Sequence, residues 1–361
     1  MRAPQTRWRQ APSSLESMCM RRREFIALVG GALVSSRLLY ADSAVVSQNP
    51  LIMQYNLESL QGEYTPIEEF YVRSHNPVPQ DLGSLALHIE GEVQKPQTLA
   101  LADLARLPVQ RLAAVLECAG NGTGPYQLAS NALWEGWPLE EVLKLAGTRA
   151  DAGYLHLEGR DGFVRSVPLS RTLQDALLVT RMNEQPLTPN HGGPWRVVFP
   201  GYYGMDSVKW VERITVADSP LKPATNDYLA QQKTASGDVE MLPLPPIQMK
   251  SAFIYPAVGA VLRMGRVDAR GVVWSNGEKV MAVEVSPDSG KTWHVAKLDP
   301  PTSKYSWRFW QAPLDLNDRG LVELQCKAVD SKGNAQPAER PADRTDGYAD
   351  NQIERIRVIV T

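Results

Sequence analysis

The chain has 361 residues, of which 43% are hydrophobic and 22% charged, and its formal net charge is −2 at pH 7. These proportions indicate a globular protein large enough for two domains and exclude a disordered or fibrous chain. The near-neutral charge lacks the basic footprint of a nucleic-acid-binding protein. Three cysteines are too few for a disulfide framework, and no CxxCH, GxGxxG or P-loop motif occurs.

The first 44 residues are predicted to be an export signal. Arg22-Arg23-Glu24-Phe25-Ile26 precedes a short, weakly apolar stretch, which is followed by small residues at positions 41–44. This order is typical of a signal peptide, and the paired arginines fit twin-arginine export, which carries folded, cofactor-loaded proteins. A basic N-terminal tail or an uncleaved anchor is the alternative. We therefore expect a periplasmic protein whose mature form has no membrane span.

Residues 45–240 are predicted to form a mixed α+β domain. After an irregular arm at residues 45–70, short strands alternate with short helices, without the regular repetition of a doubly wound fold. Strand patterns lie at residues 84–92, 112–116, 154–157 and 197–199, and helical spacing lies at residues 100–107 and 139–145.

Residues 247–361 are predicted to form an immunoglobulin-like β-sandwich. Three prolines in Asp238–Pro246 indicate a linker before it. Beyond the linker, turn signals separate short alternating strands at intervals of about 8–12 residues. Expected strands lie at residues 271–274, 279–286, 291–296, 305–310, 321–329 and 353–360. Trp274, Trp293 and Trp307 are expected to fill the core.

The segment Glu117-Cys118-Ala119-Gly120-Asn121-Gly122 is the first candidate for a functional site. It follows an apolar run, so Cys118 is expected at the end of a buried strand that turns into a Gly/Asn loop. A thiolate held there is a soft ligand for a transition metal, and the glycine backbone lets a ligand approach closely. An ordinary buried cysteine before a turn is the alternative.

Two further segments carry cations. Arg73 and His75 are two residues apart in an extended segment, so both side chains point the same way and can donate to phosphate oxygens. His191, Arg196 and Lys209 lie on loops that flank one apolar strand, and with nearby glycine amides they can form an anion cradle. A surface loop and unrelated solvated charges are the alternatives.

These segments resemble motifs of the sulfite oxidase family of molybdopterin-dependent oxidoreductases. The Cys118 loop resembles the family's Cys-(Ala/Ser/Gly)-Gly-Asn loop, and residues 70–79 resemble FxxRNHxPxP with Ser74 in place of Asn. Residues 191–210 are similar to HGxPxRVVxPGxxGxxSVKW. Residues 271–293 resemble GxAWS…VEVSxDGGxxW of the family's dimerisation domain, so the resemblance covers nearly all of residues 66–361.

The resemblance implies a molybdenum–molybdopterin cofactor with Cys118 as the metal ligand, and it implies a homodimer. The residues it assigns to the cofactor are Arg73, His75, Cys118, His191, Arg196, Ser207 and Lys209. The resemblance further implies that Tyr228, Arg73 and Trp134 serve catalysis, with Tyr228 near the metal and Trp134 lining the substrate pocket. An exposed loop tyrosine and a core tryptophan are the alternatives for Tyr228 and Trp134.

The implied activity is oxidation of sulfite to sulfate by oxygen-atom transfer at the Cys-ligated molybdenum. Because this sequence has no haem motif, the electrons are expected to pass to a separate c-type cytochrome. Two alternatives stay open. The same cofactor can serve another sulfur compound or an S- or N-oxide, including as a sulfane dehydrogenase subunit, or the chain can be a non-catalytic binding protein.

The chain departs from the family pattern in its arginines. Thr123 and Asp206 stand where relatives have arginine. A doubly charged oxyanion needs fixed cations, and losing one bidentate arginine costs about 1.5–3 kcal/mol. Arg73 remains as an anion contact, and Arg344 and Arg181 are candidates for compensation.

Overall fold

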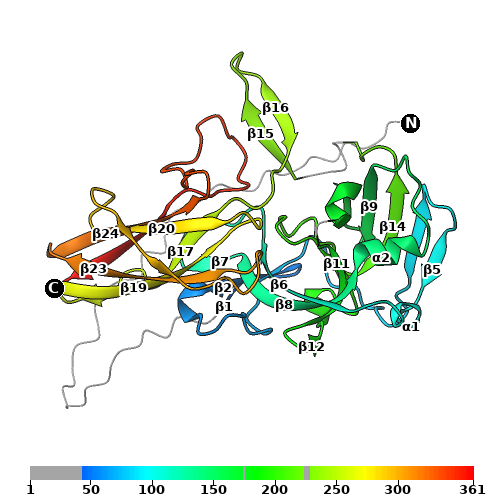
Figure 1. Ribbon diagram of the computed structural model, residues 1–361, viewed down its shortest axis with the longest axis horizontal. Coiled ribbons are helices and arrows are strands. Elements are labelled where there is room, and N and C mark those ends of the chain that lie inside the picture. The colour runs from blue at the N-terminus through cyan, green and yellow to red at the C-terminus, as the bar shows by residue number, and fades with distance from the viewer. Residues whose placement is uncertain (1–42, 174, 223–227) are drawn as a thin grey trace, which may run out of the picture. The chain divides into compact units, whose positions relative to one another are not determined.

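The computed structural model describes residues 43–361, except residues 174 and 223–227. The predicted export signal at residues 1–44 therefore lies almost wholly outside the described residues. Within the described part of the chain, no helix is long and apolar enough to cross a membrane. The described residues pack as one unit in which strands dominate (Figure 1).

The predicted α+β class is confirmed only in part, because the fold is mostly β. The α-helices of the described residues are short, namely α1 (Leu101–Leu104) and α2 (Leu139–Lys144). The helix expected at residues 100–107 is shorter, because α1 ends at Leu104, and Pro108 disfavours the helical conformation only at Leu107. Past the end of α2 stands Gly147, whose φ of 68° is easily reached only by glycine.

Two five-stranded sheets lie within residues 87–217. The first contains β12 (Gln185–Pro186), β11 (Leu177–Met182), β8 (Ala129–Pro138), β6 (Gln110–Glu117) and, beside β11, β13 (Arg196–Val198). The second contains β10 (Val164–Pro168), β9 (Tyr154–Gly159), β14 (Val211–Ala217), β4 (Leu87–Gly91) and β5 (Gln97–Leu99). In the first, β8 pairs antiparallel with β6 and β11; in the second, β14 pairs parallel with β4 and antiparallel with β9. The strands expected at 84–92, 112–116, 154–157 and 197–199 are confirmed as β4, β6, β9 and β13.

The irregular arm expected at residues 45–70 is partly β-structure instead. β1 (Ser43–Gln48) and β2 (Leu51–Asn56) form an antiparallel pair, and β2 also pairs with β3 (Val72–Arg73) and β7 (Tyr126–Gln127). The sequence did not reveal these strands because most of their side chains are only partly buried and two of the partner strands lie farther along the chain. The pairing with β2 holds Arg73 on a strand.

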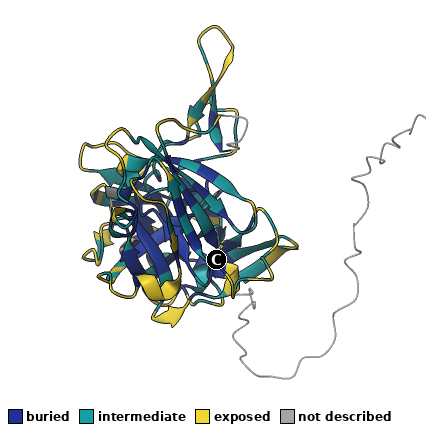
Figure 2. Cartoon of the chain, turned by 90° about the vertical axis from the view of Figure 1, so that its right-hand side faces the viewer, coloured by how far each residue is buried: buried dark blue, intermediate teal, exposed yellow. Residues whose placement is uncertain are grey.

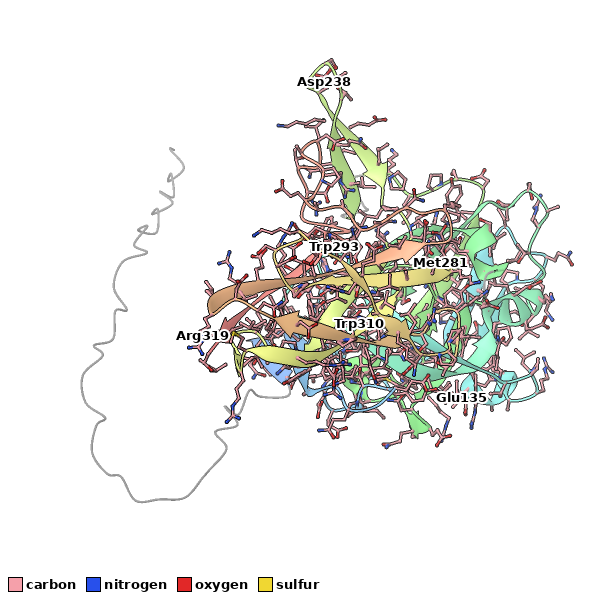
Figure 3. The ribbon with its side chains drawn as sticks, turned by 60° about the vertical axis from the view of Figure 1, so that its left-hand side comes forward. Glu135, Asp238, Met281, Trp293, Trp310 and Arg319 are labelled. Carbon is pink, nitrogen blue, oxygen red and sulfur yellow. The ribbon has the colours of Figure 1, made fainter. Side chains whose placement is uncertain are left out.

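The expected β-sandwich is present in residues 250–361, where two sheets enclose a hydrophobic core of their own. Along β23 every second residue is buried, and Trp310 (Figure 3) packs edge-on against Phe253 with ring centroids 5.4 Å apart. One sheet contains β17 (Lys250–Tyr255), β19 (Gly265–Trp274), β23 (Arg308–Leu316) and β22 (Lys297–Leu298). The other contains β18 (Val261–Leu262), β25 (Glu354–Val360), β24 (Gly320–Asp330), β20 (Val280–Ser286) and β21 (His294–Val295).

The three tryptophans expected in the sandwich core lie elsewhere. Trp293 is only partly buried, and Trp274 and Trp307 are buried in a different core cluster. That cluster also contains Phe70 and Trp134, so it packs the sandwich directly against the N-terminal part of the described chain. The site described below lies against this shared core.

The linker expected at residues 238–246 is partly a strand. β15 (Leu229–Lys233) and β16 (Val239–Pro243) form an antiparallel hairpin that stands away from the neighbouring sheets, with Asp238 at its tip (Figure 3). Figure 2 shows that the end of this hairpin is exposed. The prolines of this segment permit the strand because they lie at or after its last residue.

Candidate active site

One cavity brings together residues that are far apart in the sequence. Its wall contains residues from the segments 70–75, 116–118, 161–163 and 190–209, together with Tyr228. Eight of the nine residues predicted for the site line it, namely Arg73, His75, Cys118, His191, Arg196, Ser207, Lys209 and Tyr228. β3, the end of β6 and the loops on both sides of β13 deliver most of these side chains.

Cys118 directly follows β6 and is partly exposed in the cavity. The side chain of Asn121 fixes the loop behind it. Its Nδ2 donates to Glu117 Oε1 at 3.0 Å and to Gln127 Oε1 at 2.8 Å, and its Oδ1 accepts the Leu128 N–H at 2.7 Å. The thiol therefore projects from a rigid strand end.

A buried ion pair ties the Cys118 loop to the sandwich. Lys250, the first residue of β17, donates from Nζ to Gly122 O at 2.7 Å and lies 3.6 Å from Glu117 Oε1. Trp274 of β19 donates from Nε1 to Glu117 Oε2 at 2.8 Å. The side chains of Lys250 and Glu117 are 1% and 2% exposed, so removal of either would leave a buried charge without compensation.

The environment of Cys118 suits a metal with further ligands. Burial raises the pKa of its thiol, while the Gly120 backbone N–H and the Arg73 charge partly oppose that rise. A bound transition metal favours the thiolate, so metal binding would release the proton. In the described part of the chain, no group of three His, Cys, Asp or Glu side chains is placed to hold a metal. A metal at Cys118 would therefore need ligands from a cofactor.

Arg196 and Lys209 supply positive charge to the cavity wall. Arg196 donates from Nη2 to Ser207 O at 2.6 Å and from Nη1 to His191 O at 3.2 Å. Its Nε is buried and has no hydrogen-bond partner among the described residues. Lys209 donates from Nζ to Ser74 Oγ at 2.6 Å. Both cations are thus held in place mainly by neutral groups.

The pKa values of these cations reflect burial and crowding. Burial, together with the charges of Arg196 and Arg73, lowers the pKa of Lys209 from 10.5 to about 7. Burial also lowers the pKa of Arg196 to about 10. Asp161, which also lines the cavity, opposes the fall of the Lys209 pKa only in part, and an anion bound between Arg196 and Lys209 would raise both pKa values again. The wall therefore fits an anionic ligand such as a phosphate group.

His191 is a neutral side chain rather than the expected third cation. Burial, together with the charges of Arg196 and Lys209, lowers its pKa to about 4, against the opposing effect of the hydrogen bond to Ile67. Its Nε2 lies 2.9 Å from Ile67 O, and because a carbonyl only accepts, Nε2 carries the proton. Its Nδ1 is therefore an acceptor, suited to a ligand N–H or O–H group.

Tyr228 is a buried tyrosine, 7% exposed, and the alternative of an exposed loop residue is wrong. Its hydroxyl lies 3.2 Å from His75 Nδ1, and Phe163 packs edge-on against its ring at 6.4 Å between centroids. Burial, followed by the influence of Cys118, raises the pKa of the phenol to about 12. Tyr228 consequently stays protonated at neutral pH and can donate a hydrogen bond within the cavity.

Trp134 is the one predicted site residue that does not line the cavity, and its role in a substrate pocket stays a prediction. It is fully buried on β8, and its Nε1 donates to Ala114 O at 3.0 Å. Its ring meets Phe70 edge-on at 5.7 Å between centroids and lies 5.8 Å from the Arg196 guanidinium carbon. The core reading of this tryptophan holds, and it supports the cavity wall from behind.

The two arginines named as candidates for compensation do not line the cavity. Arg181 pairs with Glu135 at 3.1 Å, and Arg344 pairs with Asp346 at 2.9 Å. Thr123 is exposed and is also absent from the cavity wall. Arg73, the other arginine proposed as an anion contact, does line the cavity.

Asp206 meets a pair of arginines that sequence reasoning missed. Arg165 donates from Nη2 to Asp206 Oδ1 at 2.8 Å, and Arg171 donates to Oδ2. Arg165 has a recognisable signal in the sequence, because it lies in phase with the core residue Val167 on β10. A charged side chain at an inward position of a strand requires a partner.

The chain matches two family models. Residues 75–225 match the oxidoreductase molybdopterin binding domain, and residues 244–361 match the Mo-co oxidoreductase dimerisation domain. The sulfite oxidase of Gallus gallus is 34% identical over 332 residues, which cover 81% of this chain and 72% of that protein. The mitochondrial sulfite oxidase of Homo sapiens is 33% identical over 358 residues, which cover 88% of this chain and 66% of that protein.

Among solved structures, the sulfane dehydrogenase SoxCD from Paracoccus pantotrophus has the same fold. The TM-score is 0.78 at 24% identity, over 93% of this chain and 96% of that chain. The matched domain models, together with the thiol and cations of the cavity, define a molybdopterin-dependent oxidoreductase. The aligned regions cover 81–88% of this chain and 66–72% of the two sulfite oxidases. The chain therefore belongs to the sulfite oxidase family, as its motifs predicted.

Proposed function

We propose that the chain oxidises sulfite to sulfate at a molybdenum–molybdopterin cofactor. The observation that supports this most directly is that Cys118, Tyr228 and Arg73 line the same cavity. A soft metal ligand, a neutral hydrogen-bond donor and a cation then face one small substrate. The balanced reaction converts sulfite and water into sulfate, two protons and two electrons.

The residues present fit the cofactor. Cys118 would ligate molybdenum, and the buried cations Arg196 and Lys209 would bind the phosphate end. Nδ1 of His191 would accept a hydrogen bond from the pterin. When bound, the cofactor supplies the two-electron couple and the oxygen-atom transfer. The other residues proposed to contact it are Arg73, His75 and Ser207.

Arg73 and Tyr228 would act on the substrate. Arg73 donates from Nη1 to Ser74 O, which orients the guanidinium, and its charge would attract and hold the sulfite anion. Tyr228 would donate its hydroxyl proton in a hydrogen bond to a substrate oxygen. His75 Nδ1, 3.2 Å from that hydroxyl, would hold its orientation. These contacts supply positioning and charge stabilisation.

The proposal extends to partners and location. The electrons would pass one at a time to a separate c-type cytochrome, because the sequence contains no CxxCH motif. The twin-arginine pattern at Arg22-Arg23 supports export of the folded, cofactor-loaded protein to the periplasm. The match of residues 244–361 to a dimerisation domain supports a homodimer.

A second candidate function is that of a sulfane dehydrogenase subunit, or of an enzyme that acts on another sulfur compound or an S- or N-oxide. The fold of SoxCD, which this chain matches over 96% of that chain, favours it. The exposed Thr123, in place of a family arginine, favours it as well. Both functions share the cofactor and the Cys118 ligand, so substrate turnover separates them.

The test is sulfite-dependent reduction of cytochrome c by purified protein whose molybdenum content is close to one per chain. Rapid turnover that a Cys118→Ser variant abolishes would support sulfite oxidation. Full molybdenum content without sulfite turnover would exclude that substrate. In that case, turnover of thiosulfate or of an S- or N-oxide by the same preparation would identify the second candidate.

A further inference from the structure

Arg165 is a buried arginine that the cofactor roles above do not use. It lies on β10, is 5% exposed, and faces inward like its core neighbour Val167. A guanidinium in such a position stays charged and must be compensated. The groups that contact Arg165 therefore indicate the role of its side chain.

Asp206 compensates Arg165 incompletely. The Asp206 Oδ1 atom accepts from Arg165 Nε at 3.1 Å and from Nη2 at 2.8 Å, while Oδ2 accepts from Arg171. Two guanidinium groups thus share one carboxylate, which leaves one positive charge in excess. Nη1 of Arg165 is buried and has no hydrogen-bond partner among the described residues.

The excess charge lies directly behind the cavity wall, because Arg165 does not line the cavity itself but contacts Tyr228, which does. The guanidinium carbon of Arg165 is 5.4 Å from the centroid of the Tyr228 ring, and Tyr228 lines the cavity with Cys118 and Arg73. The Arg165 charge also lowers the pKa of Tyr228, against the larger effect of burial. Arg165 and Arg73 are therefore two cations placed around one tyrosine of the candidate active site.

We infer that Arg165 is a specificity-determining residue, whose Nη1 group binds a sulfur oxyanion next to Tyr228, with Asp206 as its positioning residue. The inference rests on the proposed function, because it names the group that recognises the substrate. The carboxylate of Asp206 holds the guanidinium of Arg165 through Nε and Nη2, which leaves Nη1 for a ligand.

The experiment uses molybdenum-loaded protein and sulfate as the probe. Sulfate affinity is measured by isothermal titration calorimetry, and kcat and KM are measured with sulfite. The variants are Arg165→Gln and Arg165→Lys. Arg213→Gln is the matched control. Arg213 lies on β14 of the same sheet and forms an ion pair with Glu90 at 2.8 Å, but its side chain is far more exposed than that of Arg165. A fourth variant replaces both Arg165 and Asp206 by leucine, which removes this buried ion pair and leaves Arg171, 15% exposed, as the remaining charge of the cluster.

We expect Arg165→Gln to weaken sulfate binding about tenfold or more, and to raise KM for sulfite more than it lowers kcat. Arg165→Lys should recover part of the affinity, and Arg213→Gln should leave it unchanged within about twofold. If Arg165→Gln does not fold, the double leucine variant should show the same loss of sulfate affinity.

Three results would overturn the inference: the wild-type protein does not bind sulfate, Arg165→Gln or the double leucine variant binds it as tightly as the wild type, or the control loses as much affinity. Failure of the proposed function looks different. Sulfate binding that depends on Arg165, without sulfite turnover, would support the oxyanion contact while excluding sulfite oxidation. Sulfite turnover together with a sulfate affinity that does not depend on Arg165 would support sulfite oxidation and exclude the oxyanion contact.

Discussion

At the residue scale, burial strongly lowers the pKa of Lys209 in the cavity wall. Its pKa is about 7 in the folded chain and 10.5 ordinarily, so between these pH values the folded state binds fewer protons than the unfolded state. Stability of the cofactor-free protein should therefore rise as pH increases from about 7 to 10.5. Below pH 7 both states are protonated, and the full cost of the buried charge is present.

Lys209→Met should abolish this rise and stabilise the cofactor-free protein at pH 6 on the order of 1–3 kcal/mol. The measurement is the free energy of unfolding by urea between pH 6 and 10, with the exposed Lys332→Met as the control. A bound phosphate group would keep Lys209 protonated, so the wild-type holoprotein should lack the same pH dependence. An unchanged slope in cofactor-free Lys209→Met would show that other groups cause it.

The two free cysteines of the described chain, Cys118 and Cys326, are expected to respond differently to substitution. Cys118→Ser replaces a soft thiolate by a poorer ligand, so turnover per chain should fall at least about a hundredfold with little change in stability. Cys326 is fully buried in the sandwich core, and Cys326→Ala should lower the free energy of unfolding by about 1–3 kcal/mol with turnover per molybdenum unchanged. Molybdenum analysis and urea unfolding of both variants decide this, and full activity of Cys118→Ser would contradict it.

A variant of Trp134 tests whether this side chain contacts the substrate or only packs in the core. Trp134→Phe keeps most of the ring but leaves Ala114 O without its donor, which should cost about 1–3 kcal/mol of stability. KM for the substrate should stay within about twofold, because the side chain does not line the cavity. A raised KM with unchanged stability would return Trp134 to the substrate pocket.

At the element scale, β17 of the sandwich supports the Cys118 loop, which follows β6. Lys250→Met should destabilise the protein by about 3–5 kcal/mol, because Glu117 would remain charged and buried without its partner. Molybdenum content should fall as well, since Lys250 also holds Gly122 O. Urea unfolding and metal analysis measure both effects.

The matched control for this prediction is Lys327→Met on β24. Lys327 pairs with Glu284 at 3.0 Å, with both side chains 22–31% exposed, and its loss should cost only about 0–1 kcal/mol. Equal effects of the two variants would show that the pair in the shared core is no more important than a surface pair.

At the scale of the whole molecule, an apolar row on the sandwich is a candidate for the dimer contact. Val261, Ile359 and Leu321 are 66%, 44% and 70% exposed and lie opposite one another on β18, β25 and β24. Such a row is typical of a surface that another chain covers. Leu321→Arg combined with Ile359→Arg should convert a dimer to a monomer in light scattering.

The exposed Val109→Arg, away from the sandwich, is the control and should leave the mass unchanged. Because the cavity contains no residue of β24 or β25, molybdenum content of the double variant should also be unchanged. A double variant that stays dimeric would place the dimer contact on another face.

The sequence by itself was enough for the family, the cofactor and most of the cavity wall. Cys118, His191, Arg196 and Lys209 stand in segments whose spacing already groups thiol, cations and glycines, because a ligand that contacts backbone and side chains constrains short local patterns. The strands with one buried face could be predicted for the same reason, because the alternation of apolar and polar residues is a local signal.

Tertiary structure decided the rest, because it depends on partners distant in the chain. β1 and β2 are strands only through pairing with each other and with β3 and β7, and the low pKa of His191 comes mainly from its burial. Trp134 turned out to support the wall rather than line it. Arg165 gained a partner in Asp206, 41 residues away, and charge, burial and contact at that range follow from packing that no local pattern encodes.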